Sequence, residues 1–314
     1  MRWLIGFVLA LILVGAAVPY FACDGERKVL EPADRADLPG KTAKLSLGAT
    51  YYEQGGPSSG RPVILVHGLT IPSYLWETTF EDLARAGFDV VRYDLYGRGF
   101  SDRPNVTYGP DLFEGQLAEL IEELDLEEPA HLVGLSLGGA ISVNFAAKHP
   151  DKVDRLVLIS TYYQQELPVV TKLMNAPLLG DYLMKVLGDR LLKKRLPEYY
   201  DKPVDYPQLE QRFLKQLEFV GYKKALLSTL RHYVPLDLTE SYQEVGRQER
   251  PVLILWGKHD KVIPFANSAA VLEVLPQAKL HPIDAGHVPL QEERHEECNE
   301  LIVSFLKGGP SEGL

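Results

Sequence analysis

Short, strand-like apolar runs recur along the chain and alternate with longer stretches that have helical spacing. Pro62 to Gly68 is a continuous apolar run with several β-branched residues, which is typical of a central strand buried on both faces of a sheet. Asp89 to Gly97 and Asp154 to Thr161 are further strand-like runs. Strands that alternate with helices at this spacing predict a parallel sheet with crossover helices on both faces.

The alternation stops after Thr161 and resumes at Pro251 to Gly257. The residues between, 162–249, read as helical and contain several prolines but no strand-like run. An insertion of this length is too long for a loop and is typical of a lid or a binding element. We therefore expect an α/β core at 44–161 and 250–307, with a helical cap at 162–249.

Composition and charge exclude some classes of protein. With 46% hydrophobic and 24% charged residues, the chain has the composition of a globular protein. Its formal net charge of −10 disfavours nucleic acid as a partner, because nucleic-acid binding requires a basic face. The two cysteines, Cys23 and Cys298, form no CxxC pair, and no cluster has zinc-ligand spacing.

The N-terminus is distinct, because an uncharged run extends from Trp3 to Cys23 behind a single cation, Arg2. It reaches the roughly 20 residues that span a bilayer. An uncleaved signal anchor, a signal cleaved near Ala17 and lipidation of Cys23 are the alternatives for residues 1–23. We expect export, with attachment to the extracytoplasmic face of the membrane or release to the periplasm or medium after cleavage. Residues 24–43, which are polar and rich in acids and proline, read as a tether.

A serine lies between glycines where an apolar run ends and a helical stretch begins. The sequence Gly-Leu-Ser-Leu-Gly places Gly134 and Gly138 two residues either side of Ser136. Glycines at this spacing permit a sharp strand-to-helix turn that exposes the serine hydroxyl at the carboxyl edge of the sheet. This edge is where open α/β sheets bind ligands. Ser136 is therefore the candidate nucleophile.

A serine nucleophile needs a base, and the base needs an acid to orient it. Of the eight histidines, His287 follows the last predicted strand and is the candidate base. Asp260 follows the strand before it and is the candidate acid. His259 is the rival base, and Asp284 is the alternative acid. The chain order of serine, acid and histidine is the one found in α/β hydrolases.

Two backbone amides are the candidate donors to an oxyanion. The amide of Leu137 begins the helix after Ser136, and the amide of Leu69 follows an early strand next to Gly68. We assign His67 a structural role in fixing this loop.

These motifs, in this order, resemble the α/β-hydrolase superfamily from about Leu45 to Leu306. The motifs that carry the resemblance are HGLT, DLYGRGFSD, GLSLGG, WGKHDKVIP and DAGHVPL. The resemblance implies a mostly parallel sheet of eight strands, with the helical cap inserted between strands six and seven. It also implies structural roles for Arg98 and Asp102.

Dehalogenases and epoxide hydrolases of the superfamily resemble one another in having an aspartate where this chain has Ser136. Proline iminopeptidases resemble one another in having a bulky residue directly after the nucleophilic serine, where this chain has Leu137. The apolar cap and the N-terminal segment resemble monoacylglycerol lipases and carboxylesterases. The resemblance implies a serine esterase or lipase acting on small ester or lipid substrates through an acyl-enzyme, without a metal or an organic cofactor. An acyltransferase or C–C hydrolase with the same triad, and a non-catalytic ligand-binding relative, are the alternatives.

Overall fold

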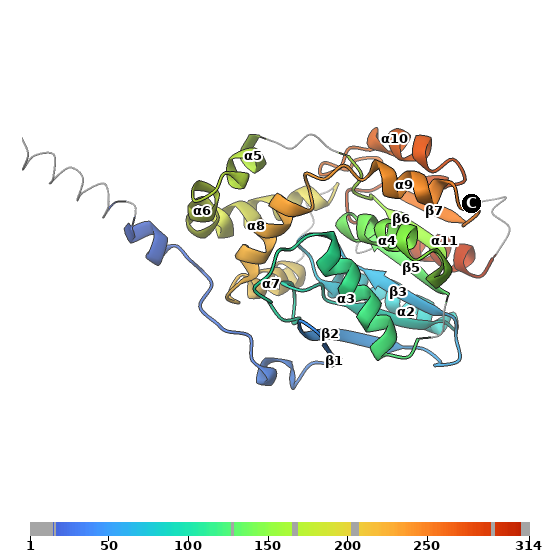
Figure 1. Ribbon diagram of the computed structural model, residues 1–314, viewed down its shortest axis with the longest axis horizontal. Coiled ribbons are helices and arrows are strands. Elements are labelled where there is room, and N and C mark those ends of the chain that lie inside the picture. The colour runs from blue at the N-terminus through green and yellow to red at the C-terminus, as the bar shows by residue number, and fades with distance from the viewer. Residues whose placement is uncertain are drawn as a thin grey trace, which may run out of the picture.

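The computed structural model describes residues 15, 17–126, 129–164, 169–201, 207–289 and 293–308. Within these residues, one sheet has eight strands in the order β1-β2-β4-β3-β5-β6-β7-β8 (Figure 1). β2 is antiparallel to its neighbours β1 and β4, and every other neighbouring pair is parallel. The strands are β1 (Lys41–Leu45), β2 (Gly48–Gly55), β3 (Pro62–Val66), β4 (Asp89–Tyr93), β5 (Ala130–Leu135), β6 (Val153–Ile159), β7 (Val252–Gly257) and β8 (Lys279–Ile283). The predicted fold class is confirmed.

The parallel strands bring distant parts of the chain to one edge of the sheet. Val66 of β3 pairs with Gly134 of β5, and Ile159 of β6 pairs with Leu255 of β7. Each of these residues lies at or near the carboxyl end of its strand. Every residue of β3, β5 and β7 is buried, as their continuous apolar runs predict. The loops that follow these strands therefore meet at the same edge.

Helices cover both faces of the sheet (Figure 1). α2 (Glu77–Arg85) and α11 (His295–Leu306) pack together on one face and share a core cluster with the strands. α3 (Pro110–Glu123), α4 (Leu137–Lys148) and α10 (Asn267–Val274) belong to the cluster on the other face. Short 3-10 helices are η1 (Pro32–Arg35), η2 (Ser73–Trp76), η3 (Pro150–Lys152) and η4 (Leu196–Tyr199).

Five helices lie between β6 and β7 in the described part of the chain. They are α5 (Val169–Asn175), α6 (Leu179–Arg195), α7 (Pro207–Gln216), α8 (Tyr222–His232) and α9 (Thr239–Gly246). α5 to α8 lie together at one end of the molecule, and we call them the cap (Figure 1). α9 instead packs against α4 and α10. The predicted cap, 162–249, includes α9, but this helix belongs to the layer of helices that covers one face of the sheet.

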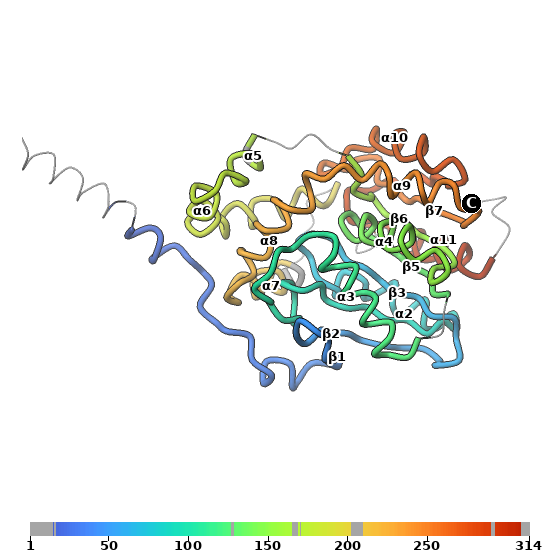
Figure 2. The backbone as a smooth tube through the Cα atoms, in the orientation of Figure 1, coloured from blue at the N-terminus to red at the C-terminus, as the bar shows by residue number. Residues whose placement is uncertain are grey.

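Residues 24–40, here called the strap, run from the cap to the sheet (Figure 2). The amides of Arg27 and Lys28 donate to the carbonyl of Glu218 at 2.8 and 2.9 Å. Arg35 donates to the carbonyl of Phe100 at 2.8 Å. The predicted tether, 24–43, is therefore bound along its length, and its last residues belong to β1, which begins at Lys41. Its polar sequence gave no apolar pattern from which these contacts could be predicted.

The predicted N-terminal segment, residues 1–23, lies mostly outside the described residues. In the part of the chain that the structure describes, no helix is both long enough and apolar enough to cross a membrane. Signal anchor, cleaved signal and lipidation of Cys23 all stay predictions.

Candidate active site

Ser136 occupies the sharp turn between β5 and α4. Its backbone has φ 55° and ψ −117°, a conformation that residues with a side chain rarely adopt. The turn is fixed by hydrogen bonds, because the Ser136 amide donates to the carbonyl of Ile159 at 2.9 Å. Its own carbonyl accepts the amide of Tyr162 at 3.0 Å. A Cβ on Gly138 would lie 2.0 Å from the carbonyl oxygen of Val66, so this position requires glycine.

Asp260 and His287 meet at the same edge of the sheet. His287 Nδ1 lies 2.7 Å from Asp260 Oδ2, and both side chains are buried. The other oxygen of Asp260 accepts the amides of Val262 and Ile263, each at 2.8 Å. Because a carboxylate only accepts hydrogen bonds, Nδ1 of His287 carries the hydrogen and Nε2 is left to accept a proton.

The two rival residues pair with each other instead. His259 Nε2 lies 2.9 Å from Asp284 Oδ1, and both side chains are about half exposed. Asp284 also accepts a hydrogen bond from Arg294 at 3.2 Å. Neither lines the cavity in which Ser136 and His287 lie.

The loop that contains Leu69 is fixed by two buried side chains. His67 Nδ1 donates to the carbonyl of Gly68 at 2.8 Å, and its Nε2 accepts the amide of Leu95 at 2.9 Å. These bonds require a neutral ring, and burial lowers the pKa of His67 to about 3. Arg98 Nε donates to the carbonyl of Leu69 at 3.1 Å. The predicted structural role of His67 agrees with these contacts.

Arg98 links this loop to the cap. It is fully buried, and its remaining nitrogens donate to the carbonyl of Tyr96 at 3.2 Å and to Thr229 Oγ1 of α8 at 2.7 Å. Burial lowers the pKa of the Arg98 guanidinium to about 10. Asp102, the other residue of this motif with a predicted structural role, accepts the amide of Ala49 at 2.8 Å and pairs with Arg35 of the strap.

Ser136, His287, Leu69 and Leu137 line one cavity of about 520 Å³ beneath the cap. Leu137 is the first residue of α4, so its amide points from a helix N-terminus, where negative charge is stabilised. Among the described residues, Ser136 Oγ and His287 are not joined by a hydrogen bond. In enzymes without substrate such catalytic hydrogen bonds are often long, and they shorten when substrate binds. The cap lines the cavity with the apolar side chains of Met174, Met184, Leu191, Leu192, Leu226 and Leu230, and also with the charged side chains of Lys194, Arg195 and Glu198.

The sequence matches the family model described as alpha/beta hydrolase fold over residues 61–293. The chain belongs to this family.

The names of several relatives of this α/β hydrolase refer to different activities, and one names only the superfamily. This chain is 31% identical over 257 residues to the AB hydrolase superfamily protein YisY of Bacillus subtilis (strain 168), covering 78% of this chain and 91% of YisY. Lipase 3 of Moraxella sp. (strain TA144) is 27% identical over 298 residues, covering 94% of this chain and 93% of the lipase. The 2-hydroxy-6-oxo-2,4-heptadienoate hydrolase of Pseudomonas putida F1 is 28% identical over 271 residues, covering 79% of this chain and 90% of that enzyme.

Solved structures show the same fold. The enol-lactonase from Burkholderia xenovorans LB400 superimposes with a TM-score of 0.74 at 23% identity, covering 85% of this chain and all of the lactonase. At this identity the likeness shows the fold alone.

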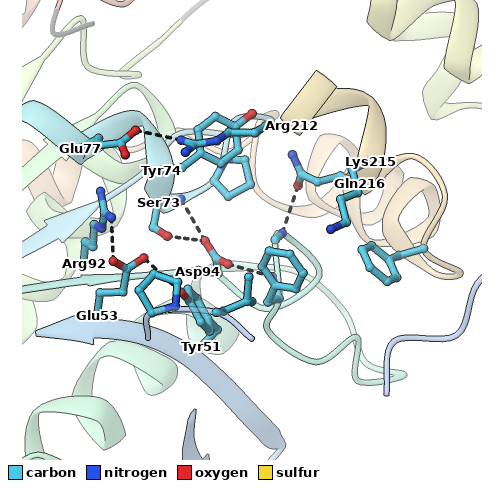
Figure 3. Close-up of a pocket in the computed structure, with 16 residues that line it drawn as sticks. Tyr51, Glu53, Ser73, Tyr74, Glu77, Arg92, Asp94, Arg212, Lys215 and Gln216 are labelled. Carbon is cyan, nitrogen blue, oxygen red and sulfur yellow. Dashed lines mark hydrogen bonds and ion pairs between the residues drawn. The ribbon is translucent and has the colours of Figure 1, made fainter. Parts of the chain in front are cut away.

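A second cavity of the α/β hydrolase, about 270 Å³, lies between the strap, the sheet and α7 (Figure 3). Asp94 lies at its base and accepts the amide and hydroxyl of Ser73 at 2.9 and 2.6 Å, and burial raises the pKa of its carboxyl. Glu53 pairs with Arg92 at 2.7 Å, and Glu77 with Arg212 at 2.8 Å. None of the proposed triad residues lines this cavity. Its carboxylates form hydrogen bonds and ion pairs between different segments of the chain, which is a structural role.

Sequence reasoning missed Thr70 and Tyr199. Thr70 directly follows Leu69, and its hydroxyl lies 2.6 Å from the hydroxyl of Tyr199, at the end of η4. The position of Thr70 after the HGL motif was a usable signal. Tyr199 had none, because the sequence does not show which part of the insertion folds over the sheet edge.

Proposed function

We propose that this α/β hydrolase is a serine hydrolase that cleaves carboxylic esters through an acyl-enzyme intermediate. Membership of the family and the similarity to a bacterial lipase over nearly the whole chain support hydrolysis. The observation that carries the proposal is the 2.7 Å hydrogen bond between His287 Nδ1 and Asp260 Oδ2, beside a cavity that Ser136 also lines.

In the acylation step, Ser136 Oγ attacks the ester carbonyl carbon while Nε2 of His287 takes the hydroxyl proton. Asp260 stabilises the imidazolium that forms and keeps the ring oriented. The amides of Leu69 and Leu137 stabilise the negative charge that develops on the carbonyl oxygen. When the tetrahedral intermediate collapses, His287 returns the proton to the departing alcohol.

Deacylation repeats these steps with water. His287 removes a proton from the attacking water, and the second tetrahedral intermediate forms in the same oxyanion site. When it collapses, His287 returns the proton to Ser136 Oγ and the carboxylic acid product leaves. The apolar residues of the cap suit an apolar acyl group, because such pockets bind chiefly by burying apolar surface.

The test is replacement of the nucleophile. Ser136→Ala should lower kcat for p-nitrophenyl butyrate by at least about 10⁴-fold, since removing a triad serine costs most of the rate. Labelling by a fluorophosphonate probe should disappear, because no hydroxyl remains to be phosphonylated. The matched control is Ser268→Ala, which removes a buried serine on α10 outside the cavity and should leave both readouts unchanged. Substantial turnover or labelling in folded Ser136→Ala protein would reject the proposal.

C–C bond hydrolysis is the second candidate, favoured by the similarity to the heptadienoate hydrolase. The two candidates share the triad and differ in substrate. Parallel assays with p-nitrophenyl esters and with 2-hydroxy-6-oxo-2,4-heptadienoate separate them. A kcat/KM at least about tenfold higher for the dienoate would replace the ester proposal.

A further inference from the structure

A short loop of the cap contacts the loops that carry three of the proposed catalytic groups, the Leu69 amide, His287 and Asp260. The loop consists of Tyr199, Tyr200 and Asp201, and we call it the cap loop. It begins at the last residue of η4, which follows α6, and lies against the carboxyl edge of the sheet.

The first contact is with the loop that carries the Leu69 amide. The Tyr199 hydroxyl and Thr70 Oγ1 lie 2.6 Å apart, and Thr70 is buried. The hydroxyl of Tyr222, in α8, also donates to the backbone carbonyl of Thr70 at 3.3 Å. Thr70 is therefore bound from the cap through both its side chain and its backbone, next to the proposed oxyanion donor.

The second contact is with the loop that carries His287. The amide of Val288 donates to the carbonyl of Tyr199 at 3.1 Å. The rings of Tyr199 and His287 have centroids 5.9 Å apart at an interplanar angle of 32°. Tyr199 thus packs beside the imidazole and binds the residue that follows it.

Glu293 and a glycine reinforce this second contact. One oxygen of Glu293 accepts the amide of Gly286 and the other accepts the amide of Asp201, each at 2.7 Å. A Cβ on Gly286 would lie 2.6 Å from the nitrogen of Asp201, so the close approach of the two loops requires glycine here.

The third contact is with the loop that carries Asp260. The ammonium of Lys261 donates to the carbonyls of Tyr200 at 3.3 Å and Asp201 at 3.0 Å. The acid, the base and the oxyanion loop are consequently all bound to three consecutive residues of the cap.

We infer that Tyr199 is a positioning residue, which orients the oxyanion loop through Thr70 and restrains His287 through its ring and carbonyl. The inference rests on the proposed function. Its physical basis is that displacing catalytic groups by about 1 Å can cost up to about 100-fold in rate. The cap then does more than enclose the substrate, because its docking fixes the geometry of the catalytic groups.

The test removes the hydroxyl pair from each side. Tyr199→Phe and Thr70→Val should each lower kcat for p-nitrophenyl butyrate by about tenfold, with KM changed less than about threefold. The double variant should be no slower than either single variant, because both remove the same interaction. Thr70→Ser, which keeps the hydroxyl, should retain most of the activity.

The matched control is Tyr163→Phe, which also breaks a tyrosine–threonine hydroxyl pair. Tyr163 lies 3.1 Å from Thr239 Oγ1 and does not line the catalytic cavity. Its kcat should stay within twofold of wild type, while its thermal unfolding midpoint changes about as much as that of Tyr199→Phe. This pair separates lost positioning from lost stability.

Three results overturn the inference. One is a Tyr199→Phe variant that folds and keeps wild-type kcat. Another is a loss expressed only in KM, which would make Tyr199 a substrate contact, and the third is strictly multiplicative losses in the double variant. If Tyr199→Phe does not fold, Thr70→Val and Thr70→Ser decide the matter by the same criteria. A wild type without ester turnover or labelling rejects the proposed function itself, and this role of Tyr199 with it.

Discussion

The two oxygens of Asp260 have different partners, and this division fixes what the residue can do. Oδ1 accepts two backbone amides, those of Val262 and Ile263, and Oδ2 accepts Nδ1–H of His287. A carboxylate satisfies all three donors at once. The amides of its own loop hold the group in place, so its second oxygen can fix the tautomer of the histidine.

Asp260→Asn should therefore be nearly inactive but folded. The asparagine oxygen must face the two amides, which leaves its NH₂ group against Nδ1 of His287. The ring then adopts the other tautomer and presents Nε2–H, which cannot accept the serine proton. We expect kcat for p-nitrophenyl butyrate to fall by about 10³–10⁴-fold. Steady-state kinetics and a thermal unfolding scan check both parts.

Asp284→Asn is the matched control for this prediction. Asp284 lies three residues before His287 in the sequence and is the alternative acid, but it pairs with His259 at 2.9 Å and is about half exposed. Its replacement should change kcat less than twofold. An equal loss in both variants would mean that the acid was assigned to the wrong residue.

The predictability of the site differs between its residues. Ser136, Asp260 and His287 could be placed together from the sequence, because each follows a strand and parallel strands end at one edge of a sheet. Tyr199 could not, since it belongs to a helical insertion whose docking depends on tertiary contacts. Its hydrogen bond to Thr70 joins residues that no periodic pattern relates.

The strap contributes to the cap at the scale of whole elements. α8 begins after Gly221, which has no side chain to cap the helix, and Glu26 of the strap takes over this role. Its carboxylate accepts the amides of Gly221 at 3.2 Å and Lys223 at 2.5 Å. Free amides at a helix N-terminus favour a negatively charged acceptor. α8 in turn carries Thr229, the partner of Arg98.

Glu26→Gln should destabilise the protein. Glutamine can offer an oxygen to only one of the two amides, because its NH₂ group cannot accept a hydrogen bond. We expect the free energy of unfolding to fall by about 1–2 kcal/mol, the usual cost of losing a helix cap. Urea denaturation measures it.

The control is Asp37→Asn, which removes the same charge from an exposed position of the strap and should change stability by less than about 0.5 kcal/mol. Equal effects of the two substitutions would indicate a general charge effect and exclude a specific cap.

Elements were predictable to the extent that their own sequence carries a pattern. β3, β5 and β7 are buried on both faces, so a continuous apolar run identified them. The strap has no such pattern, because it is bound by backbone amides and charged groups that any polar segment possesses. The packing of α9 on α4 was equally hidden, since an apolar helix face does not specify its partner.

Acid sensitivity of the whole molecule follows from histidines that fold in the neutral form. His67 is fully buried, and burial lowers its pKa to about 3. Burial lowers the pKa of His131 to about 4. In the unfolded chain a histidine takes up a proton near pH 6.5. Below that pH the unfolded state therefore binds more protons than the folded state does. The free energy of unfolding consequently falls as the pH falls toward the folded-state pKa values.

His67→Gln should weaken this acid sensitivity, because glutamine does not titrate. The substitution lowers stability at pH 7 through lost hydrogen bonds, so the decisive quantity is the change with pH. Between pH 6.5 and 4.5, the wild type should lose about 2–3 kcal/mol more unfolding free energy than the variant, since one proton contributes up to about 1.4 kcal/mol per pH unit. Urea denaturation at each pH measures the difference, with His232→Gln as the control at an exposed histidine. Parallel pH profiles for wild type and His67→Gln would show that His67 is not neutral in the folded protein, which would contradict its two hydrogen bonds to Gly68 and Leu95.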